Sequence, residues 1–141
     1  SFSMEILGFC KDKSMISRNP HKRQMNKFIW PLSKSVANWQ QYSIRLAMKA
    51  KKNRDIVGSA SVDYLMYSGY IVMAYFWAQM AQAAYEKLAG EVENRDFYRA
   101  KIKTAEFYFD RILPRTKSLA KTMMADPKTL MQLDEELLSF L

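Results

Sequence analysis

The residues best suited to binding chemistry are four cations that lie close together near the middle of the chain. Lys49, Lys51, Lys52 and Arg54 occur within a short stretch without an intervening acidic residue. Such a cluster can bind phosphate groups or another polyanion. The same cations would also suit the last turn of a helix, where positive charge compensates the helix dipole. The cluster is therefore a candidate anion site, and a purely structural role is the alternative.

The remaining reactive side chains do not form a recognisable catalytic or metal-binding pattern. His21 is the only histidine and Cys10 the only cysteine, so the usual His/Cys metal site and an intrachain disulfide are both excluded. The sequence also lacks a glycine-rich phosphate loop. We interpret the acidic groups Glu91, Glu93 and 134–136 as solvated surface charge. We therefore expect no catalytic, cofactor-binding or metal-binding residue in this chain.

The positive charge of the chain is concentrated in its first third. The net charge is +8, and residues 1–54 hold twelve Lys or Arg against Glu5 and Asp12, whereas residues 55–141 hold ten against twelve acidic residues. This asymmetry suggests an anionic partner for one part of the molecule. Because no zinc-finger, RNP-like or helix-turn-helix motif is found, we do not expect nucleic acid to be that partner. With a single cysteine and no secretory signal, a cytoplasmic location is expected.

The pattern of apolar residues predicts that helices follow a short leader. Residues 1–26 are predicted to be a basic leader or linker that holds at most one short helical piece, with Asn19-Pro20 as a turn signal, and residues 27–141 a helical bundle domain. The first long helix should run from about Trp30 to Lys52, because Pro31 suits a first turn and apolar residues follow at helical spacing. The alternative is a start one turn earlier, with a kink at Pro31.

Two further long helices and a short one are predicted from their capping signals. Asn53 with Asp55 should start the second helix, which ends before Gly90. The residues Asn94-Arg95-Asp96 should start the third, with Asn94 as its cap, and Pro114 should kink or split that helix. A short helix follows Asp126-Pro127 and passes through Leu130, Leu133 and Leu137. Short connections imply antiparallel neighbours. The sequence therefore predicts an all-α fold, an up-down bundle of three long helices plus a short C-terminal helix.

The second helix is unusual because residues 64–85 carry no formal charge. The stretch is long enough to cross a bilayer. However, it contains tyrosines and glutamines, and Asp63 and Glu86 flank it, so we interpret it as the central helix of the bundle and do not expect a membrane partner. Its small residues should allow neighbouring helices to approach closely: Gly58, Ala60, Gly69, Ala74 and Ala78.

The order of several landmarks resembles a known family. In chain order they are Ser61-Val62-Asp63-Tyr64-Leu65, Gly69, Tyr75-Phe76-Trp77, Met80-Ala81, Asp96-Phe97-Tyr98-Arg99-Ala100-Lys101, Phe107-Tyr108, Arg111-Ile112-Leu113-Pro114 and Met131-Gln132-Leu133-Asp134. The stretch from 27 to 138 looks like the C-terminal helical domain appended to an extended subgroup of acyl-CoA dehydrogenases.

The resemblance implies a parent activity and a set of partners. The parent would be an FAD-dependent enzyme that dehydrogenates an acyl-CoA thioester, with its catalytic glutamate and flavin contacts in preceding domains. No catalytic residue and no FAD site is therefore carried over to this chain. The implied role is structural: packing on the preceding dehydrogenase domain or subunit, shaping the contacts of a homo-oligomer, and bordering the acyl-CoA entrance. Lys49, Lys51, Lys52 and Arg54 would then lie near the CoA phosphates.

A second hypothesis comes from a different functional class. The chain could be a free-standing basic helical module that binds an anionic partner or nucleic acid through its bulk charge. An upstream dehydrogenase domain in the same reading frame would favour the first hypothesis over this one.

Overall fold

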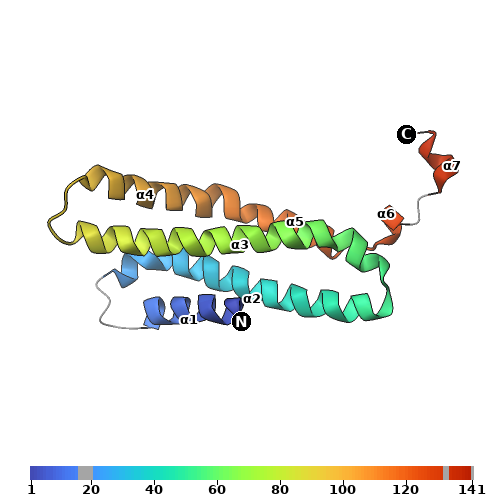
Figure 1. Cartoon of the computed structure of the whole chain (residues 1–141), viewed down its shortest axis with the longest axis horizontal. Helices are drawn as coiled ribbons and strands as arrows, with labels where there is room; N and C mark the ends of the chain where they lie inside the picture. The colour runs from blue at the N-terminus through green and yellow to red at the C-terminus, as the bar shows by residue number, and fades with distance from the viewer. Residues whose placement is uncertain (16–20, 132–133, 141) are drawn as a thin grey trace.

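The chain folds into a series of helices laid side by side, as seen in a computed structural model that describes residues 1–15, 21–131 and 134–140 (Figure 1). In chain order the elements are α1 (Phe2–Met15), α2 (Lys22–Lys52), α3 (Asp55–Leu88), α4 (Arg95–Phe107), the π-helical turn η1 (Tyr108–Ile112), the 3₁₀ turn η2 (Leu113–Arg115), α5 (Thr116–Met123), α6 (Lys128–Met131) and α7 (Glu135–Leu138). The described residues contain no strand, so the all-α prediction is confirmed for them.

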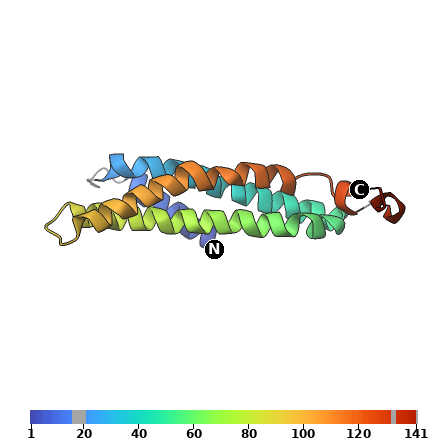
Figure 2. The same cartoon turned by 90° about the horizontal axis from the view of Figure 1, so that it is seen from above.

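The long helices run alternately up and down along one axis. Figures 1 and 2 show α2, α3 and the α4–α5 rod running antiparallel in succession, which gives an elongated molecule. Helix α3 is central, since it contacts α2, α4 and α5. The core between these rods includes an edge-to-face pair of Phe28 and Phe109, whose ring centroids lie 5.2 Å apart. Helix α1 packs along the N-terminal half of α2 (Figure 1).

The first described residues differ from the predicted leader, because α1 is part of the bundle. Ile6 and Cys10 are buried in the core. The rings of Phe2 and Phe9 make edge-to-face contacts with Tyr75 of α3. Ile6 and Cys10 lie one helical turn apart and therefore face the same side. Residues 19 and 20, where a turn was predicted, lie outside the described residues.

Helix α2 begins at Lys22 and continues through Pro31, so its predicted start near Trp30 is too late, and the alternative start one turn earlier is still about one turn too late. Met25, Phe28 and Leu32 are fully or almost fully buried on both sides of the proline. Because this stripe is continuous, the packing holds the helix together although Pro31 lacks an amide hydrogen. The predicted end at Lys52 agrees with the structure.

The two predicted capping residues, Asn53 before α3 and Asn94 before α4, gave different outcomes. At the start, the Asn53 side-chain oxygen accepts a hydrogen bond from the Asp55 amide at 3.0 Å, as the prediction required. Beyond its end, Asn94 does not cap α4 with its side chain, which corrects the second prediction. Instead Asn94 adopts a left-handed conformation with φ 57°, which asparagine tolerates better than most residues. The Arg95 guanidinium donates to the carbonyl oxygens of Leu88 and Gly90 at 3.1 and 3.2 Å.

The predicted break at Pro114 is confirmed. The rod changes from α-helix through the π-helical and 3₁₀ turns before α5 begins at Thr116. Downstream, the Asp126 carboxylate accepts a hydrogen bond from the Lys128 amide at 3.0 Å, as expected for a cap. However, α6 and α7 are separate short helices instead of one, and Leu133 lies outside the described residues.

Of the small residues of α3 that were predicted to lie against neighbouring helices, three are buried and two are exposed. Ala60, Ala74 and Ala78 are buried, as predicted. Gly58 and Gly69 are exposed, so the close helix approach predicted at these glycines is wrong. A methyl group added at Gly69 would meet no other heavy atom within 4 Å. The sequence of α3 is apolar on all sides, yet only one side of the helix is covered.

Candidate functional site

The four predicted cations lie at the end of the bundle where α2 turns into α3. Lys49, Lys51 and Lys52 occupy the last turn of α2, and Arg54 precedes the first residue of α3. All four are exposed. The turn is closed by a hydrogen bond of 2.9 Å from the Asn53 amide to the Lys49 carbonyl. The structure therefore places the predicted residues together and also leaves their helix-dipole role intact. We call these four residues the basic end.

The basic end borders two shallow pockets. Lys49 and Lys52 line one of about 340 Å³ together with Met123 and Pro127. The three lysines line a second, of about 460 Å³, with Arg45 and Met48. Arg54 lines neither of these pockets, so the four cations do not converge on one cavity. Their arrangement is that of an open, positively charged rim.

An apolar groove lies next to the basic end, between the C-terminal half of α2 and the N-terminal half of α3. One part, of about 290 Å³, is lined by Leu46, Ala47, Val57 and Ala60, among others. A second part, of about 560 Å³, reaches Ser1 and Phe2 of α1 and the Trp39 indole. We call the two parts together the α2–α3 groove. The sequence did not predict this groove, because a groove depends on where a neighbouring helix stops covering α2 and α3.

The two parts of the groove share a polar contact. The hydroxyl groups of Ser43 and Tyr64 line both parts and lie 2.7 Å apart, within hydrogen-bond distance. The Trp39 Nε1 group is buried and has no acceptor in the described part of the chain. The groove therefore combines an aliphatic floor with an indole N–H that an additional acceptor could satisfy.

The groove exists because α1 is much shorter than α2. The Gln40 side-chain amide donates to the Ser3 hydroxyl at 3.2 Å, so the first residues of α1 are level with Gln40. The rest of α2, from residue 41 to 52, extends beyond α1 (Figure 1). A fourth helical position of the bundle is thus filled along only one half of the molecule.

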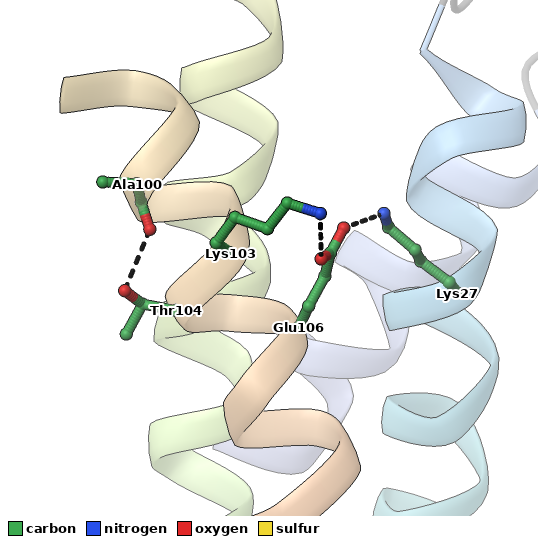
Figure 3. Close-up of polar contacts among 5 residues, drawn as sticks. All are labelled: Lys27, Ala100, Lys103, Thr104 and Glu106. Carbon is green, nitrogen blue, oxygen red and sulfur yellow. Dashed lines mark hydrogen bonds and ion pairs between the residues drawn. The ribbon is translucent and has the colours of Figure 1, made fainter. Parts of the chain in front are cut away.

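A cluster of charged side chains joins α2 to α4, away from the groove (Figure 3). The Lys27 ammonium lies 2.5 Å from one carboxylate oxygen of Glu106, and Lys103 donates to the other at 3.0 Å. The hydrogen bond from Lys27 lowers the pKa of Glu106 below its ordinary value. Burial lowers the pKa of Lys27, but its hydrogen bonds to Glu106 and Tyr85 outweigh that effect and raise the pKa overall. This charged cluster of Lys27, Lys103 and Glu106 has the geometry of a structural link between helices.

The remaining reactive groups lie apart from a possible site. Burial raises the pKa of the Cys10 thiol, an effect only partly offset by a hydrogen bond with Ser33, and this is the opposite of what activates a nucleophilic thiol. The His21 ring stacks on Tyr85 with centroids 5.9 Å apart. Within the described residues, no group of three or more His, Cys, Asp or Glu side chains is placed to hold a metal ion.

The uncharged stretch of α3 was predicted to be the central helix of the bundle and not a membrane span. Among the described residues, none of the helices combines the length and the hydropathy needed to cross a bilayer.

Comparison with known families agrees with the landmarks of the sequence. The family described as acetyl-CoA dehydrogenase C-terminal like matches residues 2–134. The chain belongs to this family. The match includes α1 as well as the later helices, and so it extends over the groove, the basic end and the charged cluster. A comparison with curated proteins finds no match to this acetyl-CoA dehydrogenase C-terminal-like chain.

Proposed function

We propose that this chain is a non-catalytic accessory domain that packs on the dehydrogenase body of an FAD-dependent acyl-CoA dehydrogenase-like enzyme. The membership of residues 2–134 in the C-terminal-like family is the observation that carries the proposal. In this assembly the flavin and the catalytic base belong to the dehydrogenase body, and the accessory domain works in the cytoplasm as part of a homo-oligomer.

The α2–α3 groove is the surface we assign to the dehydrogenase body. Its floor is aliphatic, and Ile44 and Val57 beside it are 62% and 57% exposed. The natural occupant is an amphipathic helix in line with α1, because residues 41–52 of α2 extend beyond α1 and leave the fourth position of the bundle unfilled there. Such a helix would cover the apolar floor and bring an acceptor near the buried Trp39 indole nitrogen.

The basic end is the surface we assign to the phosphates of CoA. The cluster lies beside the groove, so docking through the groove would place it at the junction of the two domains, at the edge of the acyl-CoA site. Exposed lysines attract phosphate through long-range charge, and this attraction weakens as salt is added. The acyl thioester and its oxidation would remain entirely with the dehydrogenase body.

The first experiment examines the isolated chain. The purified protein should be colourless and should not oxidise acyl-CoA with an artificial electron acceptor. A stoichiometric flavin spectrum, or turnover that disappears when a residue of this chain is replaced, would overturn the accessory role.

The second experiment examines docking. The dehydrogenase encoded in frame with this chain, or beside it, should co-purify with the chain. Val57→Asp should prevent this, because the carboxylate would lie in the apolar groove, while a favourable position in the first turn of α3 keeps the helix intact. Phe107→Asp, at an exposed residue of α4, is the matched control and should co-purify normally. Equal binding by both variants would exclude the groove as the docking surface.

The third experiment examines the basic end. Calorimetric titration of CoA should give no heat with the isolated chain and measurable binding with the assembled enzyme. In the assembly, Lys51→Gln with Lys52→Gln should weaken CoA binding and flatten its salt dependence. Unchanged binding would mean that these lysines only compensate the dipole of α2.

The rival function is a free-standing basic module, and the exposure of all four cations is the observation in its favour. That module should bind RNA or DNA on its own, with affinity that falls steeply with salt. Binding of nucleic acid by the isolated chain, together with the absence of a dehydrogenase partner, would favour the rival.

A further inference from the structure

A continuous apolar stripe covers the side of α3 that faces away from the bundle. We define this outer stripe by residues that are exposed at the same helical phase: Val62, Met66, Gly69, Met73, Phe76, Met80 and Ala83. Val62 is 69% exposed, Met73 and Phe76 are each 46% exposed, and Met80 is 36% exposed. The buried residues of α3, such as Tyr67, Ile71 and Ala78, face the opposite side of the helix. The basic end and the α2–α3 groove use none of the stripe residues.

The spacing of the outer stripe is that of a helix–helix seam. Its members follow one another at alternating intervals of four and three residues, which is the a/d pattern of a heptad repeat. An inward-facing stripe on the same helix already serves the core, so this second stripe has no function within the monomer. A heptad seam pairs most naturally with another helix of the same pattern.

We propose that the outer stripe binds the outer stripe of a second copy of this chain, with the two α3 helices antiparallel. In an antiparallel heptad pairing, each a position of one helix faces a d position of the other helix. In this register Gly69 faces Met73, Met66 faces Phe76 and Val62 faces Met80 of the other copy. Gly69 lies at the centre, where its open space receives the methionine side chain.

Charge favours the antiparallel direction over the parallel one. Asp55 and Lys87 are both exposed and lie at the same phase as the stripe, one at each end of α3. The proposed register brings Asp55 of each copy beside Lys87 of the other. A parallel pair would place Asp55 beside Asp55 and Lys87 beside Lys87, and would also bring the two basic ends together. Because the same patch is used by both copies, the pair closes on a twofold axis.

The size of the stripe predicts a reversible pair. From Val62 to Ala83 the helix rises about 32 Å at about 1.5 Å per residue, and a helix is about 10–12 Å wide. The contact would therefore cover roughly 350 Å² on each copy, less than the roughly 800 Å² per partner of a standard interface. We expect a dimer that forms and dissociates with concentration.

The first test measures self-association of the full chain by sedimentation equilibrium over a wide concentration range, with no dehydrogenase present. The wild-type chain should show a monomer–dimer equilibrium. Phe76→Ser should weaken it by about tenfold or more, because it removes the largest side chain of the seam. Phe107→Ser, at an exposed phenylalanine of α4, is the matched control and should leave it unchanged. A monomer at every concentration, or equal effects of the two serines, would overturn the proposal.

The second test determines the register. Asp55→Lys should weaken dimerisation, and adding Lys87→Asp to the same chain should restore it, because the two charges are exchanged across the seam. The double variant Val62→Cys with Met80→Cys should form intermolecular disulfides on oxidation, whereas either single variant should not. Cross-linking by Val62→Cys alone would indicate a parallel pair and overturn the register.

The two proposals, pairing of α3 helices and docking of a dehydrogenase body, are tested independently. The self-association assays contain only this chain, and the groove variants alter only residues outside the outer stripe. If the chain stays monomeric and Phe76→Ser releases the dehydrogenase instead, the stripe belongs to the dehydrogenase contact and the dimer is excluded.

Discussion

Glu106 is the side chain that links α2 to α4 by charge. It accepts hydrogen bonds from Lys27 of α2 and from Lys103 one turn earlier in its own helix. The Glu106 side chain is 26% exposed, whereas the Lys27 side chain is 46% exposed. Partial burial of the Glu106 side chain makes the pair more effective than a fully solvated ion pair, but water still screens the lysine.

The first prediction follows from the lowered pKa of Glu106. A group with a lowered pKa in the folded state stabilises the fold fully above its unfolded value, here about 4.5, and this stabilisation is lost as the pH falls through the folded pKa. Glu106→Gln should therefore cost about 0.5–1 kcal/mol at neutral pH and remove part of the acid sensitivity. Urea unfolding between pH 7 and pH 3 measures both, with Glu91→Gln as an exposed control. Parallel pH profiles for wild type and Glu106→Gln would contradict the prediction.

The second prediction concerns two small residues of α3 in opposite surroundings. Gly69 is exposed with open space around it, so Gly69→Ala should stabilise the fold by about 0.5–1 kcal/mol through helix propensity. Ala74 is fully buried, so Ala74→Leu should overpack the core and destabilise by about 1–3 kcal/mol. Chemical denaturation at concentrations where the chain is monomeric would compare the two. Loss of stability in Gly69→Ala would mean that the outer face of α3 is covered within the monomer.

At the scale of the elements, α1 changes the expected organisation most. It was expected to be a leader, yet it supplies Ile6 and Cys10 to the core and two aromatic rings to Tyr75. Its bulky apolar residues also face several directions, with Leu7 and Phe9 partly buried against the core.

The third prediction tests that role of α1. Ile6 is fully buried, so Ile6→Ala should destabilise the fold by about 2–4 kcal/mol. Met4 lies on the same helix and is 62% exposed, so Met4→Ala should change stability by less than about 0.5 kcal/mol. Thermal unfolding followed by circular dichroism provides the comparison. If residues 2–15 were a leader, the two substitutions would have the same negligible effect.

The helix boundaries that sequence predicted well are those set by local chemistry. Asn53 bonds the amide two residues later, and Pro114 removes an amide hydrogen, so both act on their immediate neighbours. The late start predicted for α2 has a tertiary cause. Packing against α1 and the core carries that helix through Pro31, and no local pattern contains this information.

The candidate site was also predictable only where local sequence determines it. The position of the basic end at the close of α2 follows from the sequence, because the three lysines and the cap residue are adjacent. The α2–α3 groove and the outer stripe were not predictable, since both depend on which faces of the helices remain uncovered. Gly69 shows the difficulty, because a helix that is apolar all round gives no indication of its buried side.

At the scale of the whole molecule, the two halves of the bundle differ in the number of helices that surround the core. The half that contains α1 has four helical positions filled, and the half that contains the basic end has the α2–α3 groove in place of the fourth. Local opening of a helix depends on how much apolar contact it must break. Stability should therefore be graded along the long axis of the molecule.

The fourth prediction is a gradient of amide hydrogen exchange. Residues 25–36 of α2 lie beside α1 and should exchange slowly, at rates close to global unfolding. Residues 41–52 of the same helix border the groove and should exchange faster through local opening. Exchange followed by mass spectrometry on the full chain resolves the two halves of α2. Uniform protection along this helix would contradict the expected gradient.

The half-filled fourth position gives assembly a further consequence. A segment that settles into the groove would have to slow the opening of residues 41–52, because free energy of binding adds to the free energy of local unfolding. Amide exchange in that half of α2 would then report occupancy directly, even for a ligand without a chromophore. The end of the molecule that binds would gain resistance to local opening only when the groove is filled.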